Sequence, residues 1–108
     1  MRYEVFLLKH AERDLSDIVE YIDLYDVIGK SIQVLNEFQK KIHSLSDTPE
    51  RVTYPKELIN LGIRKYREIY FKPYRIIYQV IENQVFVHLI ADGRRDMLAL
   101  LERRILAP

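Results

Sequence analysis

Residues 63–91 read IRKYREIYFKPYRIIYQVIENQVFVHLIA, and this stretch decides the fold class. Three runs rich in Tyr, Ile, Val and Phe, at 63–71, 74–81 and 84–91, predict β-strands. Lys72-Pro73 and Glu82-Asn83 separate these runs. Connectors this short can join only antiparallel neighbours, because parallel strands need a crossover of about a dozen residues. The stretch therefore predicts a three-stranded antiparallel meander.

Two amphipathic helices are predicted upstream of the meander. Apolar residues recur every three or four positions between residues 10 and 26 and again between residues 30 and 45, and Gly29 provides the break. The apolar positions are Ala11, Leu15, Ile18, Val19 and Ile22 in the first helix, and Ile32, Leu35, Phe38, Ile42 and Leu45 in the second. We expect the two helices to form a hairpin.

Three shorter elements complete the predicted order. Residues 3–8 suit a first strand, which we expect to pair with a strand of the meander. Residues 51–62 are expected to form a loop with one helical turn near 56–60, and Asp96 can cap a final helix that reaches Ile105. A sheet must bury one face, and the helical hairpin can cover it. The order β-α-α-β-β-β-α thus predicts an α+β fold, a two-layer sandwich of meander and N-terminal hairpin with a short C-terminal helix.

Length and composition indicate a single domain that spans residues 1–108. The chain is 48% hydrophobic and 31% charged, as is typical of globular proteins. It has no cysteine, which excludes disulfides, thiolate nucleophiles and cysteine metal sites. Its first residues lack the basic region and sustained apolar run of a secretion signal, and no stretch approaches the roughly 20 apolar residues of a membrane span. We therefore expect a soluble, cytoplasmic protein that does not contact the membrane.

The net charge of +1 conceals an asymmetry between the two halves of the chain. Residues 1–61 carry eight Lys/Arg against eleven Asp/Glu, a net charge of −3, whereas residues 62–108 carry nine against five, a net charge of +4. The basic half could face nucleic acid or an acidic peptide, and an ordinary solvated surface explains it equally well.

Motifs of several common enzyme classes are missing from the sequence. There is no phosphate-binding glycine loop, no zinc-type His/Glu pairing and no nucleophile elbow. The three histidines, His10, His43 and His88, lack the spacing of metal ligands, and His88 alternates with core-like residues on a strand. A structural role is therefore favoured for His88, and we expect neither a metal nor another cofactor.

Arginines and tyrosines beside the meander are the candidates for chemistry. A twisted antiparallel sheet could bring several guanidinium groups together to clamp a phosphate, as metal-free RNA cleavage requires in addition to a base and an acid. The arginines are Arg64, Arg67, Arg75, Arg94 and Arg95. Tyrosines that could stack on bases or donate protons are Tyr66, Tyr70, Tyr74 and Tyr78. Spacing alone favours the alternative that tyrosines suit strands and arginines solvate sheet edges.

A series of motifs resembles the RelE/ParE toxin superfamily in the same order along nearly the whole chain. They are AERDL at 11–15 with DI at 17–18 and YI at 21–22, YRE at 66–68, YRIIYQV at 74–80, and DGRRD at 92–96. The YRIIYQ strand followed by GRRD is the most specific combination. The resemblance implies the predicted fold, a type II toxin and a cognate antitoxin that wraps the toxin in a hetero-oligomeric complex. Such a partner would explain the basic half.

The superfamily contains two activities. RelE-like members cut ribosome-bound mRNA, and the resemblance assigns their catalytic roles to Arg67, Arg75 and Arg95. Residues expected to contact the target are Arg64, Lys72, Arg94, Tyr70 and Tyr74. Two proton-handling positions of RelE-like members fall on Ile69 and Leu101, whose side chains cannot transfer a proton. Tyr70 or Lys72 could take over such a role.

ParE-like members inhibit DNA gyrase and do not need this residue set, and residues 93–106 resemble the end of their sequences. We therefore favour a ParE-like gyrase inhibitor of the kind that stabilises plasmids. The alternative is a RelE-like, ribosome-dependent mRNA endonuclease, which would be the only enzymatic activity. A third possibility is a degenerate member that mainly binds its antitoxin and DNA as a corepressor.

Overall fold

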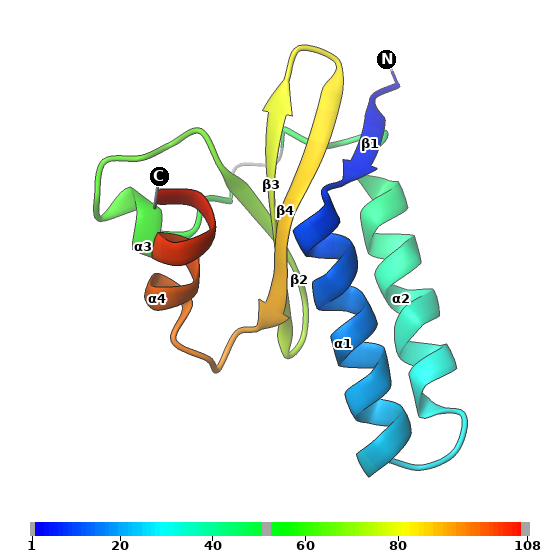
Figure 1. Cartoon of the computed structure of the whole chain (residues 1–108). Coiled ribbons are helices and arrows are strands. Elements are labelled where there is room, and N and C mark those ends of the chain that lie inside the picture. Colours follow the sequence, from blue (N-terminus) through cyan, green and yellow to red (C-terminus); the bar gives the residue numbers. More distant parts are fainter. Residues whose placement is uncertain (1, 51–52, 107–108) are drawn as a thin grey trace.

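The computed structural model describes residues 2–50 and 53–106. The start of the predicted 51–62 loop and the outer limits of the predicted 1–108 domain lie outside these residues. Figure 1 shows the elements in chain order. They are β1 (Glu4–Leu7), α1 (Lys9–Tyr25), α2 (Lys30–Ser44), α3 (Lys56–Ile59), β2 (Arg67–Phe71), β3 (Tyr74–Ile81), β4 (Gln84–Asp92), α4 (Met97–Leu101) and a π-helical turn, η1 (Glu102–Leu106). The predicted order is confirmed, including the helical turn at α3.

The four strands form one sheet in the order β1-β4-β3-β2. β2, β3 and β4 are antiparallel neighbours, which confirms the meander. β1 pairs with β4 in parallel, from Glu4 opposite Gln84 to Leu7 opposite Val87. The first strand therefore does pair across the chain with a strand of the meander.

The helical hairpin covers one face of the sheet, as predicted (Figure 1). Its core contains Ala11, Ile22, Val34, Phe38 and Leu45 from the helical side and Ile69, Ile76, Tyr78, Val85, Val87 and Ile90 from the strands. One expected core position is wrong, because Ile32 is 64% exposed and Val34 is buried instead. The turn between α1 and α2 extends past the end of the sheet (Figure 1), and Ile32 lies in the first turn of α2, next to this end.

A second, smaller core on the opposite face was not predicted. There α3 and α4 pack on the sheet through Leu58, Tyr66, Ile77, Leu89, Ala91, Met97, Leu100 and Leu101. Asp96 caps α4 as expected, since its Oδ1 accepts a hydrogen bond of 3.1 Å from the amide of Ala99. Leu101 is fully buried in this core. The C-terminal helix therefore belongs to the packing of the sheet.

A β-bulge at His88 allows β4 to contribute side chains to both cores. Ile77 pairs with Leu89 but Tyr78 pairs with Val87, so His88 is the extra residue. Such an insertion reverses the alternation of side chains between the two faces. Val85 and Val87 consequently face the hairpin, whereas Leu89 and Ala91 face α4. Burial lowers the pKa of His88, whose ring lies against Tyr66 with centroids 5.2 Å apart.

The first strand of the meander is shorter than predicted. It begins at Arg67 and not at Ile63. Gly62 adopts a positive φ of 76°, and the next apolar residues, Ile63 and Tyr66, pack into the second core. Arg64 consequently lies in the connection from α3 to β2 and not on a strand. Within the described part of the chain, no helix is long and apolar enough to cross a membrane.

Candidate target-binding site and its arginine network

The arginines do not gather into one cluster, contrary to the possibility raised by the sequence. Arg67 pairs with Tyr78 and Arg75 pairs with Tyr70, so their side chains point to opposite faces of the sheet. Arg94 and Arg95 follow the far end of β4. Lys72 follows Arg67 by five positions, which corresponds to roughly 16 Å along an extended chain. The basic residues are thus divided among both ends of the sheet and its second core.

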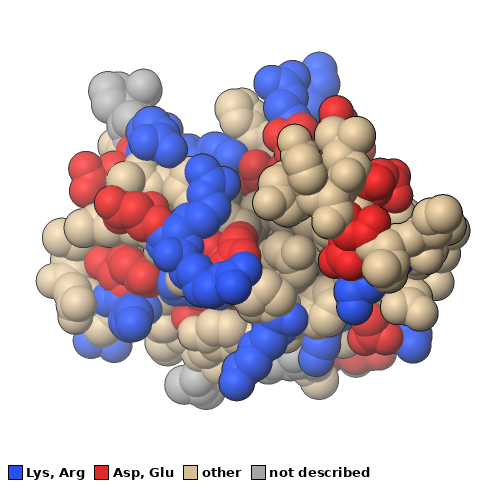
Figure 2. All heavy atoms as spheres, turned by 90° about the horizontal axis from the view of Figure 1, so that it is seen from below, with Lys and Arg blue, Asp and Glu red and all other residues tan. Residues whose placement is uncertain are grey.

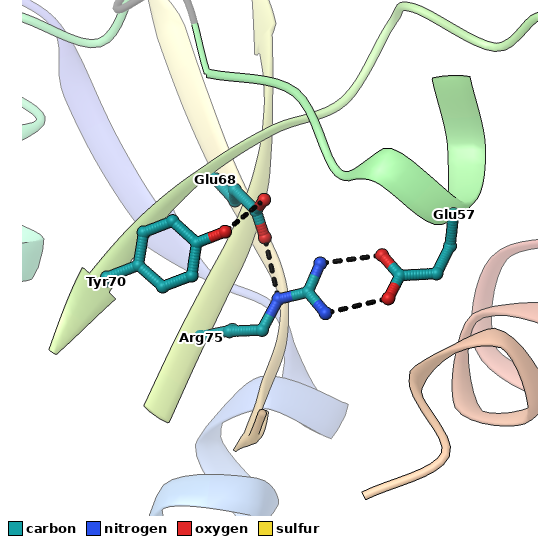
Figure 3. Close-up of polar contacts among 4 residues, drawn as sticks. All are labelled: Glu57, Glu68, Tyr70 and Arg75. Atoms are coloured by element: carbon teal, nitrogen blue, oxygen red, sulfur yellow. Dashed lines mark hydrogen bonds and ion pairs between the residues drawn. The ribbon is translucent and has the colours of Figure 1, made fainter. Parts of the chain in front are cut away.

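Arg75 is buried and bound by two carboxylates (Figure 3). Its Nη1 and Nη2 donate to both oxygens of Glu57 at 2.9 and 2.7 Å, and its Nε donates to Glu68 Oε1 at 2.8 Å. The hydroxyl of Tyr70 donates to the other oxygen of Glu68 at 2.9 Å. We call these four residues the Arg75 network. Its ionised groups, two carboxylates and one guanidinium, sum to a charge of −1.

The members of the Arg75 network come from three elements, β2, β3 and α3. Glu68 and Tyr70 lie two residues apart on β2 and therefore share a face, which is the face of Arg75 on β3. Glu57 comes from the first turn of α3, which packs over the same face through Leu58. The network thereby fixes α3 to the sheet, and it does so with charged groups that would be costly to bury alone.

The protonation states within the network follow from these contacts. The hydrogen bonds with Glu57 raise the pKa of Arg75, which stays charged, and those from Arg75 lower the pKa of Glu57. Burial, together with the bond to Glu68, raises the pKa of Tyr70. Tyr70 is therefore a weaker acid than an ordinary tyrosine, and Arg75 has two anions as its nearest partners.

Gly93, the first residue of the Gly-Arg-Arg-Asp motif, lies directly against the side chain of Arg75. A Cβ at this position would lie 2.9 Å from Cδ of Arg75 and 3.2 Å from the carbonyl oxygen of Pro73. The amide of Gly93 donates to the same carbonyl at 2.7 Å. Because the guanidinium is held at its far end, the arginine stem cannot swing away. The glycine therefore allows the loop after β4 to pass over Arg75.

Four of the eight residues expected at the site lie at the end of the sheet nearest the hairpin turn. Lys72 is exposed between β2 and β3, and Arg94 and Arg95 are exposed after β4. Arg94 donates to both carboxylate oxygens of Asp92, at 2.9 and 2.6 Å. Tyr74 is half-buried against Phe38 and, with Arg94 and Arg95, lines a hollow of about 540 Å³ beside α1. Figure 2 looks at this end and shows Lys and Arg side chains near the middle of the face.

The other expected residues lie elsewhere. Arg64 and Arg67 line a hollow of about 300 Å³ at the opposite end of β2, together with Lys65 and two glutamates. Tyr70 is exposed, and Arg75 is in the network. Of the two further tyrosines considered for base stacking, Tyr66 is buried, and Tyr78 is buried with its hydroxyl donating to the carbonyl of Pro49 at 2.7 Å.

Three residues with a structural part around these sites, Glu57, Asp14 and Arg104, had no role assigned from the sequence. Glu57 lies in the helical turn predicted near 56–60, 18 residues from Arg75. Asp14 accepts two bonds from Arg104, at 2.9 and 2.8 Å, and one of 3.0 Å from the amide of Ile90. Asp14 thus provides a hydrogen-bond acceptor for the backbone of β4 beyond the point where β1 ends. Asp14 belongs to a recognised motif, but nothing local indicates a partner 90 residues away.

The described residues contain no group of three or more His, Asp or Glu side chains arranged to hold a metal ion. The arrangement offers cations for an anionic partner and exposed aromatic rings.

Stability should depend on the charge of Glu57 at acid pH. Because the folded chain lowers the pKa of Glu57, its contribution is complete above the ordinary value of 4.5 and is lost as the pH falls through the lower folded value. We expect urea unfolding between pH 7 and pH 3 to show a shallower acid decline in Glu57→Gln than in wild type. Glu20→Gln, on the exposed side of α1, should keep the wild-type profile. An unchanged acid decline in Glu57→Gln would contradict a stabilising ion pair.

Comparison with known proteins identifies the family. Residues 5–97 match the family model described as the ParE toxin of the type II toxin-antitoxin system parDE. The chain belongs to the ParE toxin family. Among curated proteins, none matches the sequence of this family member.

Solved structures of low sequence identity share the fold of this ParE-family toxin. The chromosomal ParDE toxin-antitoxin system from P. aeruginosa matches with a TM-score of 0.70 at 11% identity, over 84% of this chain and 96% of that one. A mutant of the E. coli toxin RelE in the free state matches with a TM-score of 0.64 at 18% identity, over 97% of this chain and 99% of that one. The toxin-antitoxin complex RelBE2 from Mycobacterium tuberculosis matches with a TM-score of 0.54 at 19% identity, over 85% of this chain and 99% of that one. These likenesses confirm the α+β fold of the RelE/ParE superfamily.

Proposed function

We propose that this ParE-family toxin inhibits bacterial growth by acting on DNA gyrase and does not cut RNA. The observation that carries the proposal is the Arg75 network. A ribonuclease would need Arg75 to stabilise the phosphate in the transition state. Here Glu57 and Glu68 accept hydrogen bonds from three of its nitrogens and give the site a negative charge, which repels a phosphate.

The two positions that lack a proton-transfer group support the same proposal. Ile69 is buried in the core under the hairpin, and Leu101 is buried in the second core. Neither side chain transfers a proton, and the packing leaves neither position open to a substrate. Arg67 lies on the other face of the sheet from Arg75, so the two cannot clamp one phosphate.

A cognate antitoxin is part of the proposal. Two of the similar structures are a ParDE system and a RelBE2 complex, in which a toxin is accompanied by its antitoxin. The basic C-terminal half of the present chain would attract an acidic segment of such a protein. Toxin and antitoxin would then form a hetero-oligomer in the cytoplasm.

The RelE-like alternative rests on three exposed residues. Tyr70 and Lys72 lie at the end of β2, and Arg95 follows β4. A tyrosine and two cations could serve a phosphodiester if the Arg75 network opened. The likeness to RelE in fold agrees equally with both activities.

Two assays run together decide between the activities. We expect the purified chain to inhibit supercoiling by bacterial DNA gyrase, or to trap cleaved DNA, and to leave mRNA in ribosomal complexes intact. Arg95→Ala should stay folded, because an exposed arginine contributes little to stability. Codon-positioned cuts that disappear in Arg75→Ala and Arg95→Ala would overturn the proposal in favour of the RelE-like alternative. Normal growth of cells that express folded protein would favour the corepressor.

A further inference from the structure

The turn of the helical hairpin combines exposed apolar side chains with negative charge. We define the hairpin tip as residues 17–32. Of the twelve large hydrophobic side chains that are exposed in the described chain, six lie in this segment, so the exposure is concentrated and not scattered. They are Tyr21, Leu24, Tyr25, Val27, Ile28 and Ile32. Contiguous apolar patches of this kind mark interaction surfaces on soluble proteins.

The charge of the hairpin tip excludes nucleic acid as its partner. The segment contains Asp17, Glu20, Asp23 and Asp26 against Lys30 alone, which gives a net charge of −3. In Figure 2 the side of the molecule that carries the hairpin is mostly tan with Asp and Glu side chains, and Lys and Arg gather beside it. A phosphate backbone would be repelled, whereas a protein surface with apolar and basic side chains would be attracted.

Local contacts brace the hairpin tip. The hydroxyl of Ser31 donates to Asp23, which joins α2 to α1, and Asp26 Oδ1 accepts from the amide of Val27 at 2.7 Å. The rings of Tyr21 and Tyr25 pack with their centroids 4.8 Å apart. A surface that is already ordered loses little conformational entropy on binding. The exposed rings are therefore suitable anchors.

A hollow next to the hairpin tip offers a place for a partner side chain. Asp17, Tyr21 and Asp26 line the hollow of about 540 Å³ together with the end of β4. Large side chains inserted into such hollows often dominate the energy of an interface. Arg94 and Arg95 line the same hollow, so the match to a lysine or arginine that flanks an apolar partner side chain is confined to the hairpin side, where Asp17 and Asp26 lie.

We propose that the hairpin tip is the surface with which this toxin docks on a basic, apolar patch of its protein target, which is DNA gyrase in the function proposed above. The inference rests on that function but adds the contact surface and its chemistry. Charge favours the target over an acidic antitoxin segment, because the basic half of the chain, at +4, offers the antitoxin a better match than the tip does.

The test compares tip variants with a matched variant elsewhere. Leu24→Ser/Ile28→Ser removes apolar tip surface at constant charge, and Asp17→Lys/Glu20→Lys reverses two charges. Leu61→Ser/Ile81→Ser removes similar exposed apolar groups outside the tip. Thermal unfolding checks that all three variants fold.

We expect each tip variant to need about tenfold more protein for half-inhibition of gyrase supercoiling, and to arrest bacterial growth correspondingly less. The loss caused by the charge variant should shrink at higher salt. Leu61→Ser/Ile81→Ser should match wild type. Folded tip variants with wild-type inhibition and growth arrest would overturn the tip as the docking surface and leave the gyrase proposal intact. If wild type arrests growth without affecting gyrase, and the tip variants fail to arrest growth, gyrase is the wrong target and the docking surface stands.

Discussion

Replacement of Arg75 by Ala is expected to lower the free energy of unfolding by about 3–5 kcal/mol, which is the usual cost of removing one partner from a buried ion pair. The change leaves Glu68, which is 2% exposed, without its cation, and Glu57 loses both of its hydrogen bonds from the guanidinium. It also removes the stem against which Gly93 packs. Urea unfolding monitored by circular dichroism measures the loss.

A combined variant separates the ion pair from its individual charges. Glu57→Met/Glu68→Leu/Arg75→Met replaces the charged groups by apolar ones of similar size, and such exchanges are often neutral or stabilising. We expect it to recover most of the stability lost in Arg75→Ala. Arg95→Ala, at an exposed arginine, should change the free energy of unfolding by no more than about 0.5 kcal/mol. A loss below about 1 kcal/mol in Arg75→Ala would show that the network does not hold α3 to the sheet.

The combined variant also tests the role of Arg75 in growth arrest. If Arg75 only holds the fold, a stable triple variant should arrest growth as wild type does. A triple variant that is folded but harmless would indicate that Arg75 acts on a substrate, as the RelE-like alternative requires. Stability and toxicity are thereby measured on the same proteins.

The sequence predicted the architecture because each element carries its own pattern. Strands joined by connectors as short as those within residues 67–92 can form only an antiparallel meander. The recurrence of apolar residues every three or four positions around Phe38 predicts one buried helix face. The errors lie where tertiary packing overrides local preference. Ile63 and Tyr66 have the composition of a strand but pack into the second core. Ile32 continues the helical stripe beyond the end of the sheet.

The candidate site could be predicted only in part. The sequence pointed to arginines beside the meander, and the structure places Arg75 on β3 as expected. The sequence could not indicate that Glu57 binds Arg75, because the two residues are 18 positions apart and no local spacing encodes such a pair. The bulge at His88 changes which residues of β4 share a face, and one inserted residue leaves little trace in an apolar run. The division of the arginines follows from three-dimensional register, which sequence periodicity does not supply.

Phe38→Ala should be the most damaging change in the core under the hairpin, with an expected loss of about 3–5 kcal/mol in the free energy of unfolding. Phe38 has no exposed surface and lies between α2 and the end of β2 and β3. Its ring centroid lies 5.1 Å from that of Phe71 and 5.0 Å from that of Tyr74. Truncation therefore leaves a cavity where the hairpin meets the sheet, next to the segment that orients the hairpin tip.

Phe6→Ala is the matched control for Phe38→Ala, because both remove the same ring. Phe6 is 39% exposed and stacks only on Phe86 among the aromatic residues described, with centroids 5.5 Å apart. Its loss should cost about 1 kcal/mol, as an aromatic pair at a surface does. Equal losses in the two variants would mean that the hairpin is not held to the sheet through Phe38. If the difference holds, Phe38→Ala should also weaken growth arrest at temperatures where the protein is still folded, because the hairpin tip is then less firmly positioned.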